Sequence, residues 1–128
     1  MLYLLIFLLL RSGIGVEGGS LHVDATTVHD CARHGVAVFG DLGGAGGTAM
    51  LSGCVLQGNR GNGALVRDGA RLEMADSSAV GNAGWGVLVG ADGAATLQSV
   101  RFAGNGLGGV SVDELGSCSG CSPETLVG

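Results

Sequence analysis

The chain has 128 residues, of which 46% are hydrophobic and 13% charged, and this much apolar sequence predicts one folded domain rather than a disordered chain. The formal net charge is −5, with six basic residues in all. This acidic balance argues against a nucleic-acid partner, because phosphate backbones are bound by basic surfaces.

The first ten residues form an apolar run, MLYLLIFLLL, which is followed by Arg11. A membrane-spanning helix needs about twenty apolar residues. A signal peptide has a positive charge before its apolar run and a small-residue cleavage site after it. Three interpretations of residues 1–12 stay open: a cap or first strand of the core, a degenerate signal or membrane anchor, and an artefactual start inside a longer chain. Membrane association is therefore left open.

From Gly13 onward the sequence repeats. Residues 61–83 and 84–106 are two blocks of equal length that align without a gap. A glycine opens each of five successive copies, at Gly13, Gly35, Gly63, Gly86 and Gly109. The copy that begins at Gly35 is longer than these two blocks, and the stretch DLGGAGG is the natural place for the insertion.

Each copy contains three short stretches in which apolar residues alternate with their neighbours. Val87 and Val89 represent the first stretch, Leu72 and Met74 the second, and Leu56 the third. Alternation with a period of two predicts strands rather than helices. A circuit of three strands in each copy returns the chain to its starting point, so each strand is expected to pair in parallel with its copy about 4.8 Å along an axis. The sequence predicts an all-β, single-stranded parallel β-helix of about five rungs over residues 13–113, with an irregular tail over 114–128.

An asparagine recurs in a fixed phase of the repeat, at Asn59, Asn82 and Asn105, each directly after a glycine. Glycine and asparagine suit turns that need a positive φ, and the asparagine amide can bond its copy in the next rung. We therefore expect a structural asparagine ladder at these three positions. In the first rung, Cys31 takes the place of the asparagine.

Three segments carry a resemblance to a known family: LQGNRGNGALV, SAVGNAGWGVLV and RFAGNGLGGVSV. They resemble the pectin-lyase-like superfamily of right-handed parallel β-helices, over a range from about Gly13 to Asp113. The resemblance implies a right-handed coil. It implies no single activity, since the superfamily includes polysaccharide lyases, glycoside hydrolases, phage tailspikes and surface adhesins. Complete members usually have more rungs, so this chain resembles a fragment of such a protein.

A different pattern competes for the N-terminal glycines. Gly13, Gly15 and Gly18 match G-x-G-x-x-G after an apolar run, and Asp41 lies where a ribose-binding acid would stand. That fingerprint requires a helix after the glycines, whereas residues 19–33 show no helical apolar stripe and are rich in β-branched residues. A dinucleotide-binding protein is therefore a minor alternative, and the β-helix interpretation predicts no cofactor.

Catalysis on this coil would need charged groups that project together from neighbouring rungs. Asp41 and Asp92 share a phase two rungs apart, which is near the roughly 5–9.5 Å that separates glycosidase carboxylates. Both aspartates lie in glycine-rich turns, where solvated aspartates are common. We favour turn aspartates over an acidic pair, and we assign no catalytic residue.

The cysteines and histidines predict no metal site. Residues 29–34, HDCARH, hold the densest group of possible ligands, but zinc needs three or four ligands in a tetrahedral array and no second cluster supplies them. We interpret this stretch as a polar turn. Cys54 lies in an inward column and is expected to be a buried thiol, while Cys118-Ser-Gly-Cys121 predicts a local disulfide or two free thiols.

Four apolar side chains lie on or beside the outer side of the first strand of their rungs: Phe39, Leu65, Leu88 and Trp85, the last of these one residue before its strand. Such a row can bind sugar rings or a partner's surface, or it can be covered by a missing segment. We predict a non-catalytic module, secreted or on the cell surface, that presents a repetitive face to carbohydrate or protein. The alternative is a fragment of a polysaccharide lyase or glycoside hydrolase without its catalytic rungs.

Overall fold

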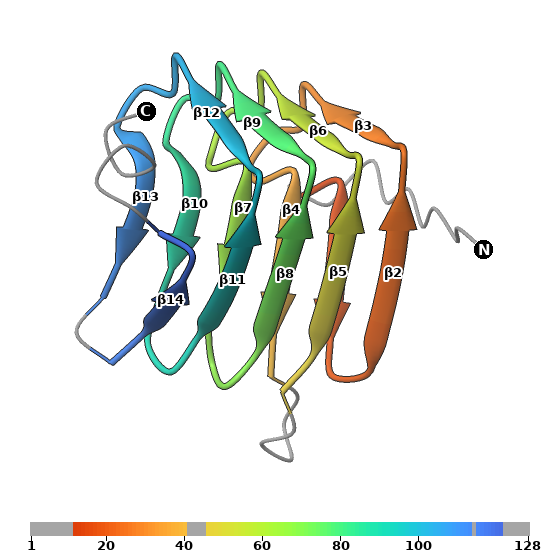
Figure 1. Ribbon diagram of the computed structural model, residues 1–128, viewed down its shortest axis with the longest axis vertical. Helices are drawn as coiled ribbons and strands as arrows, with labels where there is room; N and C mark the ends of the chain where they lie inside the picture. The colour runs from red at the N-terminus through yellow and green to blue at the C-terminus, as the bar shows by residue number, and fades with distance from the viewer. Residues whose placement is uncertain (1–11, 41–45, 114, 122–128) are drawn as a thin grey trace.

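The computed structural model describes residues 12–40, 46–113 and 115–121 of the chain. The described part forms β-strands joined by turns and contains no helix. The strands form three sheets, each made of parallel strands, and the chain passes through the three sheets in turn (Figure 1). Sheet A contains β1 (Ile14–Glu17), β4 (Val36–Phe39), β7 (Ala64–Val66), β10 (Trp85–Val89) and β13 (Gly108–Val112). Sheet B contains β2 (Ser20–Asp24), β5 (Thr48–Ser52), β8 (Arg71–Ala75), β11 (Ala94–Gln98) and β14 (Ser117–Ser119). Sheet C contains β3 (Thr27–His29), β6 (Val55–Gln57), β9 (Ser78–Val80) and β12 (Arg101–Ala103).

One strand from each sheet makes a rung, and each strand pairs in parallel with its copy in the next rung. The described residues form four complete rungs, and β13 and β14 form part of a fifth. In sheet A the partners of Val87 are Ala64 on one side and Val110 on the other, which is the spacing of the sequence repeat. The parallel β-helix expected from the sequence is confirmed.

The coil continues past Asp113, into the segment expected to be irregular. Ser117 pairs in parallel with Ala94, so β14 extends sheet B beyond the last recognised repeat. This strand reads Ser-Cys-Ser. It lacks the apolar alternation that marks the other strands, so the spacing from β11 is the only sequence signal for it.

The insertion in the second rung lies between sheets A and B. Before it, Val36 pairs with Ala64, and the stretch of chain between these partners includes the inserted residues. After it, Thr48 pairs with Arg71, at the same spacing as the partners in the later rungs. An antiparallel bridge between Gly40 and Gly46 closes the base of the loop. Residues 41–45 lie outside the described residues.

The core consists of the inward-facing side chains of all three sheets. Val36 and Val38 in sheet A, Leu72 in sheet B and Leu56 in sheet C are completely buried, and Met74 is 2% exposed. Along β8 the more exposed and the buried residues alternate, as expected for a strand with one face on the core. Burial of each such aliphatic side chain contributes about 1.5–3 kcal/mol.

Close packing along the axis requires the glycines that open the second, third and fourth rungs, Gly35, Gly63 and Gly86. A Cβ atom on Gly63 would lie 2.6 Å from the carbonyl oxygen of Gly86, and one on Gly35 would lie 2.7 Å from that of Gly63. These glycines do not have a positive φ, whereas Gly58 and Gly81, before the asparagines, do. The expectation of positive φ is therefore correct for the second set, while the first set is glycine because the next rung approaches too closely for a side chain.

The turn from sheet B to sheet C holds one residue with positive φ in every complete rung. These are Ala25 (φ 46°), Gly53 (62°), Asp76 (49°) and Ser99 (54°). Since glycine has no Cβ penalty there, Ala25→Gly is expected to stabilise the protein by about 1 kcal/mol, measured by urea unfolding. The reverse change, Gly53→Ala, is the matched control and should destabilise it by a similar amount. A Cβ on Gly53 would have its nearest neighbour at 3.8 Å, so the effect is conformational. Equal stabilities for all three proteins would contradict this explanation.

The dinucleotide-binding alternative is wrong. The pattern Gly13, Gly15, Gly18 surrounds strand β1, and the residues after it form β2 and β3 instead of a helix. The fingerprint needs the N-terminus of a helix to bind the pyrophosphate. Asp41, the expected ribose ligand, lies outside the described residues.

The apolar run at the N-terminus lies outside the described residues, and its three interpretations stay as predictions. Among the residues that the structure does describe, no helix is long and apolar enough to cross a membrane.

Candidate functional site

Buried asparagines form a hydrogen-bonded column between sheets C and A. The backbone N–H of Asn59 donates to Oδ1 of Asn82 (3.0 Å), and that of Asn82 donates to Oδ1 of Asn105 (3.0 Å). The side-chain amides donate to the same oxygens at 2.9 Å. Each amide also donates to a backbone carbonyl of the preceding rung, as Asn82 Nδ2 does to Leu56 (3.1 Å). This asparagine ladder satisfies polar groups that the coil encloses, so its role is structural.

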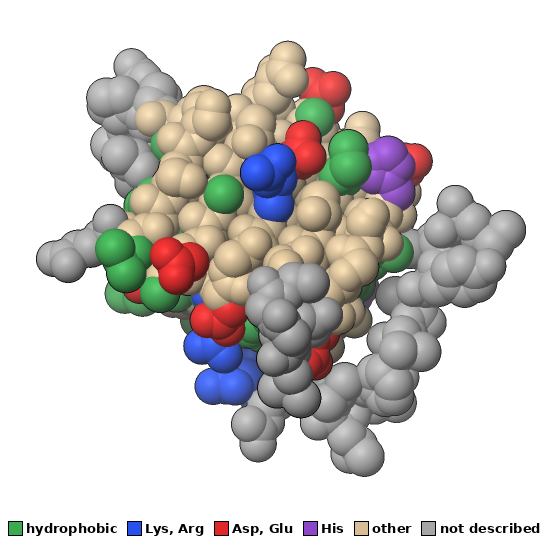
Figure 2. Space-filling view, turned by 90° about the horizontal axis from the view of Figure 1, so that it is seen from below, with side chains coloured by type: hydrophobic (Ala, Val, Ile, Leu, Met, Phe, Trp, Pro, Cys, Tyr) green, Lys and Arg blue, Asp and Glu red, His purple; other side chains and the backbone are tan. Residues whose placement is uncertain are grey.

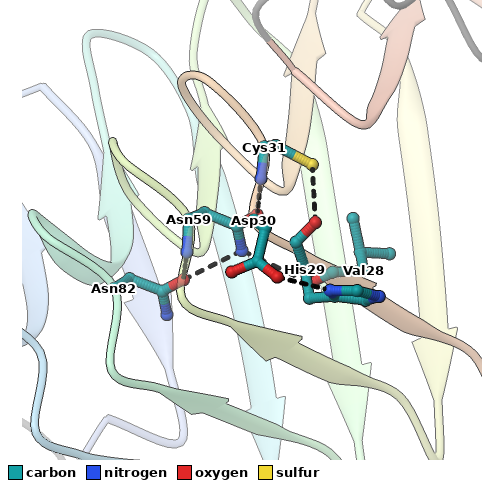
Figure 3. A network of polar contacts seen from close by, with 6 residues as sticks. All are labelled: Val28, His29, Asp30, Cys31, Asn59 and Asn82. Carbon is teal, nitrogen blue, oxygen red and sulfur yellow. Dashed lines mark hydrogen bonds and ion pairs between the residues drawn. The ribbon is translucent and has the colours of Figure 1, made fainter.

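Cys31 continues the column in the first rung (Figure 3). Its backbone N–H donates to Oδ1 of Asn59 (3.0 Å), and its sulfur lies 3.7 Å from the carbonyl oxygen of His29. Burial raises the pKa of the Cys31 thiol, and the negative charge of Asp30 raises it further, while a backbone hydrogen bond from Gly13 lowers it. The balance keeps the thiol protonated at neutral pH, which does not suit a nucleophile.

The polar stretch around Cys31 does not converge on a point that could hold a metal. His29 Nδ1 and the Asp30 carboxylate lie 2.8 Å apart, on exposed side chains. His34 instead contacts Asn62 in the next rung. Within the described residues, no group of three or more histidine, cysteine, aspartate or glutamate side chains is placed to bind a metal ion.

The other cysteines are separate from this column. Cys54 is buried, and its sulfur lies 3.3 Å from the carbonyl oxygen of Val23. Cys118, in β14, forms a disulfide with Cys121. The buried thiol and the local disulfide are thus both as expected, the latter being one of the two states left open for that pair.

A second, shorter ladder lies one residue before the rung-opening glycines. The backbone N–H of Asn62 donates to Nδ1 of His34 (3.1 Å), and that of Trp85 donates to Oδ1 of Asn62 (2.7 Å). Asn62 is buried and His34 half-buried. This ladder was not predicted from the sequence. His34, Asn62 and Trp85 occupy equivalent positions of the repeat, each directly before a rung-opening glycine. Because the three residue types differ, the sequence shows no recurring residue there.

The outer face of sheet A aligns side chains in two columns. Leu65 pairs with Ala37 on one side and with Leu88 on the other. Two residues further along the strands, Glu17 pairs with Phe39. The guanidinium of Arg67, from the next rung, lies 5.0 Å from the centre of the Phe39 ring, within the range of a cation–π contact. Leu65 and Leu88 are register partners, and Phe39 lies two positions after Ala37 in the neighbouring strand.

The part of these columns that comes from β1, β4 and β7 lines a groove of about 390 Å³, which we call the sheet A groove. Ala37 and Leu65 supply an apolar floor, and Leu65 is 8% exposed. Phe39 is half-buried. Gly15 also lines the groove, and the remaining lining residues supply polar and charged side chains: Ser12, Glu17, Arg33, His34 and Arg67. The groove therefore combines an aromatic ring with several hydrogen-bonding groups in a small space.

Of the four apolar residues expected to form a binding row, the sheet A groove contains Phe39 and Leu65. Leu88 and Trp85 are half-buried and lie further along sheet A, beyond the residues that line the groove. Trp85 begins β10, whereas the sequence placed it one residue before its strand.

Only one member of the proposed acidic pair lies in the described residues. Asp92 is exposed in a turn, with a φ of 58°. Asp41 lies outside the described residues, so the pair stays a prediction. The conformation of Asp92 is the one that aspartate adopts in tight turns.

Sheet B carries a second groove, of about 330 Å³, on its outer face. His22, Met50 and Glu73 form a continuous column along it, since each is the register partner of the next. This groove was not predicted from the sequence, because its outward residues are of mixed chemistry. Figure 2 shows a different face, seen from below, on which hydrophobic, acidic and basic side chains are spread over a surface made mostly of backbone and other side chains.

Comparison with known proteins identifies the fold. A family model described as a right-handed β-helix region matches residues 11–122. No curated protein and no solved structure matches the chain. The match includes every described strand, and the parallel register with its regular spacing is the arrangement that such a coil requires. The chain belongs to the right-handed β-helix family.

Proposed function

We propose that the chain is a non-catalytic β-helix module, secreted or on the cell surface, that binds carbohydrate in the sheet A groove. The observation that carries this proposal is the Phe39 ring, placed in a groove beside charged groups that can bond hydroxyls. Aromatic rings stack on the apolar faces of sugars, and small-molecule sites combine an apolar lining with a few polar groups.

The polar groups of the groove match the needs of a polyol. Arg33 and Arg67 are donors, and Glu17 is an acceptor. Nδ1 of His34 accepts a hydrogen bond from Asn62, so in the neutral ring the proton is on Nε2, which is a further donor. Because the walls are paired strands, binding would order few additional residues.

The chemistry of the groove favours binding over catalysis. Glycoside hydrolases use two carboxyl groups that flank the scissile bond, and Glu17 is the single carboxylate among the described residues that line the sheet A groove. An enzyme fragment, the competing interpretation, would need its second acid from residues outside this groove.

The disulfide between Cys118 and Cys121 supports the proposed location. Disulfides form and persist in the oxidising compartments outside the cytosol. Carbohydrate polymers are accessible to a secreted or surface module in the same compartments.

The experiment is a glycan array probed with the purified chain, followed by calorimetry with the retained glycan. Phe39→Ala is expected to weaken binding about tenfold, because a stacked ring contributes roughly 1.5 kcal/mol. Met50→Ala is the control, since Met50 is 37% exposed on sheet B, outside the groove. Binding of no glycan, or equal affinity of the Phe39→Ala variant and the native chain, would overturn the proposal. Loss of binding in the Met50→Ala variant alone would move the site to the sheet B groove.

A further inference from the structure

His34 is the one member of the second ladder that can change its charge near neutral pH. Its Nδ1 accepts the backbone N–H of Asn62 (3.1 Å), and the side-chain amide nitrogen of Asn62 lies 3.3 Å from the same atom. An imidazole nitrogen can accept a hydrogen bond only when it carries no proton. The contact therefore requires the neutral ring, with its proton on Nε2.

The surroundings of His34 oppose its protonation. Burial lowers the pKa of His34 below its ordinary value of 6.5, and the positive charges of Arg33 and then Arg67 lower it further. Glu17, from β1, lines the same groove and is the opposing charge there. Glycine at position 61 leaves room for the ring, since a Cβ on Gly61 would lie 2.9 Å from Nδ1.

We infer that His34 makes a pH-sensitive contact between the first two rungs. The contact forms when the imidazole is neutral and breaks when the imidazole gains a proton. In the imidazolium form, Nδ1 and both Asn62 nitrogens are donors that face one another. The buried N–H of Asn62 then loses its acceptor, and the ring has to turn away from the ladder. His34 and Arg33 line the sheet A groove, so the release changes the groove as well.

The direction of the pH dependence follows from linkage. The pKa of His34 is lower in the folded chain than in the unfolded chain, so at acidic pH the unfolded chain binds more protons. The stability that the neutral ring contributes is fully present above the ordinary pKa of 6.5. It is lost as the pH falls from that value toward the lowered pKa of the folded state.

The chain itself supplies the design of the test variant. Asn62 occupies the same phase as His34, one rung later, and its Oδ1 accepts the N–H of Trp85 at 2.7 Å. His34→Asn therefore keeps an acceptor in the ladder and removes the titrating group. His22→Asn is the matched control, because His22 is exposed on sheet B and belongs to neither ladder.

Urea unfolding is measured at pH 8 and pH 5.5 for the native chain and both variants. The midpoint of the native chain and of His22→Asn is expected to fall by about 0.5 M or more on acidification. The midpoint of His34→Asn should fall by less than half as much. An equal fall in all three proteins would overturn the inference.

A second measurement does not depend on the variants. In the native chain, the ring resonances of His34 and the backbone amide resonance of Asn62 should titrate together, with a midpoint below pH 6.5. An Asn62 amide resonance that stays constant through the titration of His34 would also overturn the inference. Neither measurement uses a glycan, so the result stands apart from the success or failure of the proposed carbohydrate site.

Discussion

Replacing Asn82 with alanine is expected to destabilise the protein by about 3–5 kcal/mol, measured by urea unfolding. Asn82 is 1% exposed, and its Oδ1 accepts both the backbone N–H and the side-chain amide of Asn59. Its own amide donates to Leu56 and Asn105. Removal of the side chain leaves several of these buried groups without partners, and each such group costs about 1–3 kcal/mol.

Asn105→Ala is the graded control for this change. Asn105 is 8% exposed and accepts from Asn82 in the same way. Its ladder position is nearer the end of the described coil, where water can replace part of the lost bonding. We expect the Asn105→Ala variant to lose less stability than Asn82→Ala. A loss below about 1 kcal/mol for Asn82→Ala would show that the ladder is not a main source of stability.

Gly63→Ala is expected to destabilise the protein by about 3 kcal/mol or more, or to prevent its folding. The added Cβ would lie 2.6 Å from the carbonyl oxygen of Gly86 and 3.0 Å from Nδ2 of Asn82. The Gly86 carbonyl belongs to the next rung and cannot move without disturbing the parallel pairing of sheet A, and Asn82 is a member of the asparagine ladder. Overpacking of a rigid interior costs roughly 1–3 kcal/mol, and disturbance of the asparagine ladder adds to that. Urea unfolding measures the loss.

Gly15→Ala provides the comparison in the same sheet. Gly15 lies on the outer face of β1, and a Cβ there would have no atom within 4 Å. Its replacement is expected to be neutral or to stabilise the strand by up to about 1 kcal/mol. Similar losses for both variants would mean that contact with the next rung does not explain why a glycine opens each rung of this chain.

The repeat was sufficient to predict the coil. The length of the repeat gives the spacing between paired strands, and the alternation of apolar residues shows where those strands lie. Strand pairing at a fixed sequence spacing gives equivalent residues the same environment, so the fully buried Val38, Val66 and Val89 recur in the sequence as they do in sheet A. The asparagine phase carried equally direct information, since one residue type occupies the same buried position in three rungs.

The parts that the sequence did not predict are those where equivalent positions hold different side chains. His34 and Asn62 each accept a backbone N–H from the next rung. A histidine and an asparagine at equivalent positions are not recognised as a sequence repeat. β14 has too few apolar residues to show alternation. The cation–π contact of Arg67 with Phe39 joins a residue after one strand to the end of another, and its distance depends on side-chain rotamers.

Only part of the candidate site could be predicted from the sequence, because a repeat pattern does not show which side chains line a groove. Phe39 and Leu65 were predicted because they alternate with the inward residues of their strands. This alternation shows to which side of the sheet each side chain points. Whether a side chain then lines a groove depends on the depth at which it lies and on the turns beside it. Leu65 faces outward and is still only 8% exposed, while Leu88, its register partner, lies outside the groove.

The longer second rung has a consequence for how this coil accommodates extra sequence. The additional residues lie at the corner between β4 and β5, and the bridge between Gly40 and Gly46 closes off their base. On both sides of that corner every strand keeps its partners, from Val36 with Ala64 to Thr48 with Arg71. The walls of the coil are therefore fixed in length, whereas this corner tolerates a change in length without any re-pairing. A peptide grafted at this corner would join β4 to β5 while the paired strands on either side kept their register.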